Sequence, residues 1–392
     1  MAKARKYDIV LFGASGFTGQ LTADYLARHG GERLRWALAG RSPEKLAQLR
    51  ARLAAINPAC ADLELLGADS DDPSSLQQLA RSTRVVVTTV GPYLLHGEPL
   101  VAACAAAGTD YLDLTGEPEF VDRMWLRHHD TARETGARII HCCGFDSVPH
   151  DLGCWFTVQQ LPEDVPIRVQ GFVRAGGQIS GGTLHSAVLA MSRLGASRRV
   201  QRERQQREGL SVDRRIRSLP HGLRYMPALG GWAVPLPTID AQVVRRSAAA
   251  LDRYGPDFRY GHFLQVKHAR SLALLLGGTA AVAAGAQFRI TREQLLKLRG
   301  SGQGPSPTER AKGWFKLSFI GEGGGQCVRC EVAGGDPGYG ETAKMLAEAA
   351  LCIAYDRVPR SAGCVTPVQA MGNALLERLQ RAGLRFEVVD RK

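Results

Sequence analysis

A short apolar run followed by a glycine-rich turn constrains this chain most. Residues 9–12 are apolar, and Gly13, Gly16 and Gly19 follow at three-residue spacing. Such a run is typical of a parallel strand buried on both faces. The pattern predicts a strand, a turn whose backbone approaches a pyrophosphate, and a helix over residues 18–29 with its N-terminus facing the anion. By itself, the spacing also fits a strand-to-helix turn without a ligand.

The end of the second predicted strand indicates which dinucleotide the chain binds. Residues 34–39 are apolar except for Arg35, and they lead into Gly40, Arg41 and Ser42, with Lys45 one helical turn later. An acidic residue at this place would bind the ribose 2′-hydroxyl of NAD, whereas an arginine beside a hydroxyl accommodates the 2′-phosphate of NADP. We therefore expect NADP(H), although an isolated arginine could also be a solvated charge.

Strand and helix patterns alternate through the first 145 residues. Strands are predicted over residues 9–12, 34–39, 63–67, 85–90, 111–114 and 138–142, and helices over 18–29, 44–56, 73–80, 98–107 and 119–135. This alternation predicts an α/β fold with a doubly wound parallel sheet, an NADP-binding Rossmann domain over residues 1–150. Ligands of such sheets bind beyond the carboxyl ends of the strands. The cofactor-binding candidates are Gly13, Ser15, Gly16, Phe17, Thr18, Gly19, Arg41, Ser42, Lys45, Asp69, Val90, Gly91 and Pro92.

The pattern changes after about residue 165. A strand over 167–173, a glycine-rich stretch over 176–183 and a helix over 183–194 are predicted, followed by an antiparallel hairpin of residues 314–320 and 326–332 around a glycine turn. We assign residues 151–340 to an α+β substrate or covering domain. Helices over 341–355 and 366–382 predict that residues 341–392 return to pack on the first domain.

The net charge of +12 is concentrated in one segment. Ten arginines lie between Arg193 and Arg224, against three acidic residues. No aromatic platform or recognition motif accompanies them, so we expect no nucleic-acid partner. A solvated helix face would also explain them, and so would an acidic partner protein or an anionic membrane surface.

An uncharged stretch over residues 271–286 is too short to span a bilayer. We expect it to be a buried helix pair, with interfacial membrane contact as the alternative.

The nine cysteines and the absence of an export signal predict a cytoplasmic protein. Association with a membrane surface stays open as an alternative. Cys327 and Cys330 form a single C-x-x-C within a predicted strand, so their side chains point to opposite faces. Zinc binding by such a motif needs a second pair, and none follows at suitable spacing. No metal site is therefore predicted.

Several motifs together resemble the saccharopine dehydrogenase-like oxidoreductases. They are residues 13–19 (GASGFTG), 39–42 (AGRS), 89–93 (TVGPY), 110–117 (DYLDLTGE) and 143–149 (CGFDSVP). Residues 180–183, 335–339, 365–367 and 370–379 are similar to the trans-acting enoyl reductase branch. The resemblance covers nearly the whole chain and implies an NADP-binding Rossmann domain, a middle domain that covers the cofactor, and C-terminal helices.

The resemblance also implies an activity: reduction of an enoyl double bond on a carrier-bound chain in lipid, glycolipid or polyketide biosynthesis, in trans to a synthase. Such a reaction needs a proton donor beside the nicotinamide. Tyr93 is the first candidate, and Asp146 and Ser147 follow the last strand of the sheet. Tyr93 could instead be a packing aromatic over the cofactor, and His150 and Asp151 are expected at a helix start. The oligomeric state is not predicted.

Other functions remain open from the sequence. One is a saccharopine-type amino-acid dehydrogenase acting on a small carboxylate, and another is a nucleotide-binding lipid-surface protein without turnover. A cysteine nucleophile at Cys142 or Cys143 is a weaker alternative. A short-chain dehydrogenase is not supported, because no tyrosine precedes a lysine by four residues.

Overall fold

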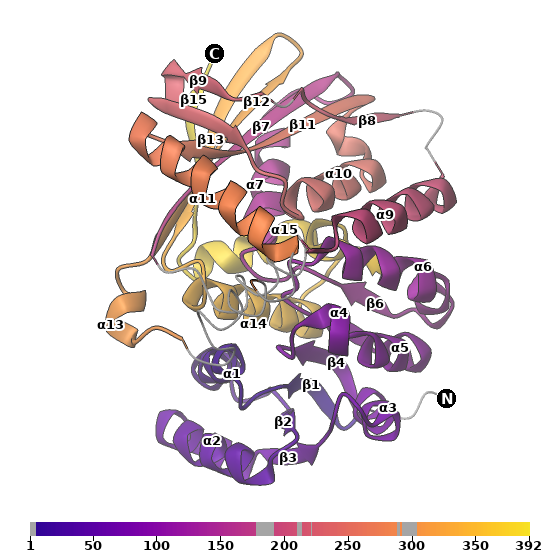
Figure 1. The fold of residues 1–392 in the computed structure, drawn as a ribbon. Helices are drawn as coiled ribbons and strands as arrows, with labels where there is room; N and C mark the ends of the chain where they lie inside the picture. The colour runs from indigo at the N-terminus through magenta and orange to yellow at the C-terminus, as the bar shows by residue number, and fades with distance from the viewer. Residues whose placement is uncertain (1–4, 178–191, 210–213, 221, 288–290, 292–303) are drawn as a thin grey trace. The chain divides into compact units, whose positions relative to one another are not determined.

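The computed structural model describes residues 5–392 except 178–191, 210–213, 221, 288–290 and 292–303 (Figure 1). The chain divides into two compact units. The first contains residues 1–145, 301–304 and 339–379, and the second contains residues 146–300, 305–338 and 380–392.

The first unit is built on a parallel sheet of seven strands in the order β14-β6-β5-β4-β1-β2-β3. Every neighbouring pair in it is parallel. The strand order reverses direction between β1 and β4, which is the place where doubly wound sheets bind nucleotides. The predicted fold class is thus confirmed. The strands are β1 (Tyr7–Phe12), β2 (Trp36–Gly40), β3 (Glu64–Gly67), β4 (Thr83–Thr88), β5 (Asp110–Leu112), β6 (Arg138–Ile140) and β14 (Gly363–Val365).

The apolar run that opens the chain forms the centre of this sheet. All six residues of β1 are buried, as a strand covered on both faces requires. The helices of the unit follow their predicted positions closely, except for the short helix α4 (Tyr93–His96) and the 3₁₀ turn η1 (Pro58–Asp62), which were not predicted. The other helices are α1 (Phe17–His29), α2 (Pro43–Ile56), α3 (Pro73–Ser82), α5 (Glu98–Ala107), α6 (Pro118–Thr135), α14 (Gly340–Tyr355) and α15 (Pro367–Arg381).

The second unit is built on a mixed sheet with the order β15-β13-β12-β7-β11-β10-β9, and β8 pairs with β11. Its strands are β7 (Ile167–Gly176), β8 (Arg215–Ser218), β9 (Arg224–Met226), β10 (Gly231–Pro235), β11 (Asp257–Val266), β12 (Trp314–Gly323), β13 (Gln326–Gly334) and β15 (Arg385–Arg391). Its helices are α7 (Val148–Val158), α9 (Leu194–Glu208), α10 (Asp240–Ala250), α11 (Ala269–Gln287) and α13 (Pro307–Arg310), with 3₁₀ turns η2 (Pro227–Leu229) and η3 (Asp252–Tyr254).

The predicted hairpin is confirmed as β12 and β13, which pair antiparallel from Phe315 opposite Gly334 to Gly323 opposite Gln326. Helix α7 packs on these two strands, and α10 packs on α7 and β11. Gly153 permits this close packing, because a Cβ at that position would lie 2.4 Å from the Phe319 ring. The unit therefore has its own core, as the α+β prediction requires.

Several features differ from the sequence-based predictions. The short strands β14 and β15 were not expected, and β15 joins the second sheet instead of continuing the C-terminal helices. The predicted helix over 183–194 and glycine-rich stretch over 176–183 lie mostly outside the described residues.

The expected buried helix pair over 271–286 is wrong. This segment lies within the single helix α11, on which Leu274 is 78% exposed. Within the described parts of the chain, no helix combines the length and apolar character that a membrane crossing requires.

Candidate functional site

The glycine loop of the first unit has the tight geometry of a phosphate-binding turn. Gly13 has a φ of +81°, and its N–H donates to the carbonyl of Ala39 on β2 (3.0 Å). A Cβ at Gly13 would lie 2.6 Å from Val90 Cγ2, and one at Gly19 would lie 2.2 Å from the Gly13 carbonyl oxygen. Both positions therefore require glycine, and Gly16 between them is exposed.

The N-terminus of α1 is left available for an anion. Gly16 is the residue before the helix, and no side chain caps the helix there. The first N–H groups of a helix carry a partial positive charge, so an uncapped end next to a glycine turn suits a pyrophosphate. Beside it, Phe17 packs edge-to-face on Tyr339 with ring centroids 4.8 Å apart. Ser15 lies in the glycine turn and Thr18 in the first turn of α1, and their carbonyls accept from the side chains of Gln20 and Thr22.

Two basic side chains lie exposed at the end of β2. Arg41 and Lys45 are solvent-exposed, and no ion pair to either is formed within the described part of the chain. Ser42 is the N-cap of α2: its Oγ accepts from the Lys45 N–H (3.3 Å) and donates to the Glu44 carboxylate (2.8 Å). The cap explains why the chain turns here and keeps the Arg41 side chain outside the helix.

The loops after β3 and β4 complete the same edge of the sheet. The Asp69 carboxylate accepts from the Asp71 N–H (3.1 Å) and shapes the turn before α3. Thr89 Oγ1 donates to the Gly13 carbonyl (3.1 Å), which ties the β4 loop to the glycine loop. Val90, Gly91 and Pro92 follow, with a cis peptide between Gly91 and Pro92. All cofactor candidates of the first unit are thus brought to one edge.

Tyr93 is placed differently from what its candidacy as a proton donor requires. Its side chain is 4% exposed, and its hydroxyl donates to the Thr88 carbonyl (3.1 Å). Its ring packs on Phe120. Burial, and then the charge of Asp113, raise the pKa of Tyr93 well above its ordinary value. The geometry fits a residue that holds the loop in place.

Glu117 anchors the loop after β4 by accepting hydrogen bonds from its backbone, a role that the sequence analysis did not predict. Its buried carboxylate accepts from the backbone N–H groups of Tyr93 (3.1 Å) and Leu94 (2.8 Å), at the start of α4. The residue is 4% exposed. A buried carboxylate that accepts backbone N–H groups is well stabilised, and it fixes the conformation of the loop. The only sequence signal was its position in the 110–117 motif.

Asp146 and Ser147 begin the second unit, directly after Phe145 in the chain. Asp146 is partly exposed, whereas Ser147 is completely buried and precedes α7. Burial of its carboxyl group and the charge of Asp240 raise the pKa of Asp146 to about 7. His150 and Asp151 lie in the first turn of α7, as predicted.

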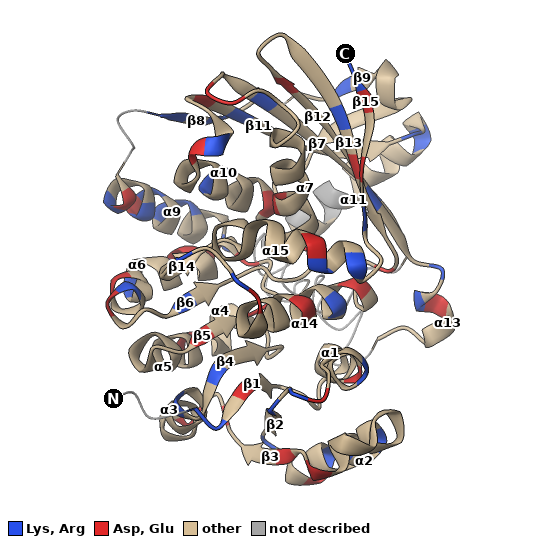
Figure 2. Cartoon of the chain, turned by 180° about the vertical axis from the view of Figure 1, so that it is seen from behind, with Lys and Arg blue, Asp and Glu red and all other residues tan. Residues whose placement is uncertain are grey.

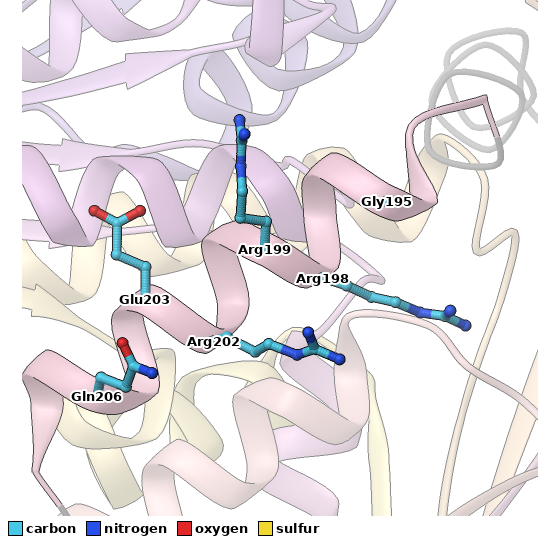
Figure 3. Close-up of a pocket in the computed structure, with 6 residues that line it drawn as sticks. All are labelled: Gly195, Arg198, Arg199, Arg202, Glu203 and Gln206. Carbon is cyan, nitrogen blue, oxygen red and sulfur yellow. The ribbon is translucent and has the colours of Figure 1, made fainter.

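The arginine-rich segment contains α9 of the second unit. A cavity of about 520 Å³ lies against this helix and is lined by Gly195, Arg198, Arg199, Arg202, Glu203 and Gln206 (Figure 3). Arg198 and Arg202 point to the same side of α9 in that view. Figure 2 shows basic residues along the helix. Arg204 differs from them, because it is buried and pairs with Glu208 (3.1 Å).

The first unit therefore fits a dinucleotide cofactor: a glycine cradle, an uncapped helix end and the switch point of a parallel sheet coincide. Residues 9–140 match the family of the saccharopine dehydrogenase NADP binding domain. Over 98% of this chain and 100% of the other, the fold is similar to that of apo saccharopine dehydrogenase (L-Glu forming) from Saccharomyces cerevisiae, with a TM-score of 0.59 and 13% sequence identity. The fold and site define a nicotinamide-dependent oxidoreductase.

Proteins related to this chain by sequence identify its family within the oxidoreductases. A Mycobacterium tuberculosis protein grouped by name with the trans-acting enoyl reductases is 40% identical over 98% of both chains. The trans-acting enoyl reductase of Mycobacterium bovis is 36% identical over 97% of both chains. The chain belongs to the trans-acting enoyl reductase family.

Proposed function

We propose that this chain uses NADPH to reduce the carbon–carbon double bond of an enoyl thioester carried by an acidic carrier protein. The observation that carries the choice of NADPH is Arg41 at the end of β2, which is exposed and forms no ion pair with another described residue. A guanidinium there is suited to the ribose 2′-phosphate, with Lys45 as a second cation. The enoyl substrate is supported by the activity in the names of the relatives.

The first unit would hold the cofactor through residues already at one sheet edge. Gly13, Gly16 and Gly19 let the pyrophosphate meet the backbone and the N-terminus of α1. Val90, Gly91 and Pro92, fixed by Glu117, would support the nicotinamide end. When bound, the nicotinamide supplies the hydride, which adds to Cβ of the enoyl thioester.

The substrate then needs a proton. As hydride adds to Cβ, the electron pair of the double bond moves toward the thioester oxygen, and Cα takes a proton from an acid. Of the three candidates, Asp146 is the one with a carboxyl group whose pKa is raised to about 7, whereas the Tyr93 hydroxyl donates to the Thr88 carbonyl and Ser147 is buried. We assign proton donation to Asp146, and loop positioning to Tyr93.

The carrier would approach the second unit through α9. Arg198, Arg199 and Arg202 are exposed on this helix and line one cavity. Carrier proteins are acidic, so three exposed guanidinium groups against the single carboxylate of Glu203 favour their encounter.

Two substitutions test the assignment of the donor. Asp146→Asn is expected to lower kcat for enoyl reduction about 100-fold or more, the usual contribution of a general acid. Tyr93→Phe keeps the ring packing and is expected to retain most of the activity. The assignment is wrong if Tyr93→Phe abolishes NADPH oxidation while Asp146→Asn leaves it unchanged.

A further inference from the structure

Three buried side chains of the second unit converge although they are far apart in the sequence. His150 lies in the first turn of α7, Asp240 is the first residue of α10, and His262 lies in the middle of β11. Each is only 1% exposed. One potential ligand atom from each residue lies within 4.8 Å of the others. Polar groups are costly to bury unless they are hydrogen-bonded, paired or bound to a metal, so the burial of these three side chains has to be explained.

The distances do not match ordinary hydrogen bonds. His150 Nδ1 is 3.3 Å from Asp240 Oδ1, and His262 Nε2 is 3.5 Å from Asp240 Oδ2. The first unit offers a comparison, because the buried pair His141 Nδ1 and Asp113 Oδ2 is separated by 2.7 Å. A hydrogen bond to a carboxylate has about this shorter length. Two ligands of a tetrahedral zinc ion, each about 2.0–2.1 Å from the metal, lie about 3.3 Å apart.

The partners of the cluster aim its acceptor atoms inward. The Thr238 hydroxyl donates to Asp240 Oδ2 (2.5 Å), and the Tyr260 hydroxyl lies 3.2 Å from His262 Nδ1. With Nδ1–H donating to Tyr260, the Nε2 lone pair of His262 faces the Asp240 carboxylate. Within the described part of the chain, neither His262 Nε2 nor Asp240 Oδ1 has a hydrogen-bond partner. In this tautomer of His262 two acceptors face each other, and either a metal ion or a shared proton must lie between them.

We propose that His150, Asp240 and His262 bind one divalent transition-metal ion of the zinc type, with water completing its coordination. Two imidazoles and one carboxylate are typical zinc ligands, whereas calcium and magnesium prefer oxygen ligands alone. The contact of His262 with Tyr260 matches the outer partner that metal-bound histidines have. The ion would join the starts of α7 and α10 to β11. All three ligands belong to the second unit, so this site does not depend on the proposed function.

Metal analysis of the full-length protein tests the site. The protein is made without an affinity tag in zinc-supplemented medium and purified without chelators. Mass spectrometry is expected to find one zinc ion per chain after desalting. Exchange for Co²⁺ is expected to give the visible absorption of a tetrahedral site. If the chain holds no zinc, takes up none when reconstituted, and gives no cobalt spectrum, a shared proton occupies the cluster and the proposal is overturned.

Variants locate the ion. His262→Gln is expected to abolish stoichiometric zinc. Tyr260→Phe keeps the ring and removes only the outer hydroxyl, so it remains informative if the first variant does not fold. It is expected to lower the zinc affinity about 10- to 100-fold in competition with a chromophoric chelator. His128→Gln, which alters a histidine of the first unit 3.5 Å from Glu98, is the control and should bind zinc normally. Wild-type affinity in both cluster variants contradicts the assignment.

Discussion

Replacing Glu117 should destabilise the first unit and weaken cofactor binding together. The carboxylate accepts from the N–H groups of Tyr93 and Leu94 at 3.1 and 2.8 Å, in a position that is 4% exposed. A hydrogen bond to a charged group contributes about 1.5–3 kcal/mol, and its loss leaves a buried donor unpaired. Glu117→Ala removes both bonds, so the expected loss is about 3 kcal/mol or more.

This loss is large enough to measure as a thermal midpoint. At about 2–4 °C per kcal/mol for a unit of this size, Glu117→Ala should lower Tm by roughly 6–12 °C. Glu117→Gln retains one acceptor oxygen and should lose about half as much. The control is Glu98→Gln, which breaks an exposed ion pair with Arg127 and should cost about 0–1 kcal/mol.

Thermal unfolding followed by circular dichroism, with and without NADPH, gives the result. Because Glu117 fixes the loop that carries Val90, Gly91 and Pro92, the Kd for NADPH should rise in the same variants. The reasoning is refuted if Glu117→Ala is no less stable than Glu98→Gln. It is also refuted if the variant is destabilised but binds NADPH with unchanged affinity at a temperature where it is folded.

Two further predictions concern the charged surfaces. Arg41→Asp should raise KM for NADPH about 10- to 100-fold, the equivalent of the charged hydrogen bonds lost, and should leave KM for NADH nearly unchanged; equal losses with both cofactors would contradict the 2′-phosphate assignment. Arg198→Glu with Arg202→Glu should slow reduction of a carrier-bound enoyl substrate at low salt but not that of the same acyl group on a small thiol. Arg360→Glu, at another exposed site, is the control, and a double variant that behaves like it would exclude α9 as the carrier surface.

Much of the first unit could be predicted because its signals are local. The run over residues 9–12 and the glycines that follow determine β1 and the turn through spacing alone. Strands of three residues such as β14 carry too few residues for a periodic pattern. Strand β15 is largely exposed, and its alternation of polar and apolar residues ends after Val388, which is too short a pattern to predict a strand.

The parts of the site that could be predicted are those set by residues close together in the sequence. Arg41 could be placed at a strand end, but the acceptor of the Tyr93 hydroxyl could not be predicted, because it depends on how the loop folds back on β4. The contact between Glu117 and that loop joins two strand-end segments, and no spacing predicts it. The same holds for His150 and Asp240, which come together only once α7 and α10 have packed.

Transfer of a labelled hydride tests the central claim most directly. The chain is incubated with NADPH deuterated at C4 of the nicotinamide and an enoyl thioester on an acidic carrier protein, and the acyl product is analysed by mass spectrometry. We predict a saturated chain with one deuterium at Cβ and one solvent proton at Cα, formed in step with NADPH oxidation. A chain that binds NADPH but leaves a broad set of enoyl thioesters unreduced would contradict the account.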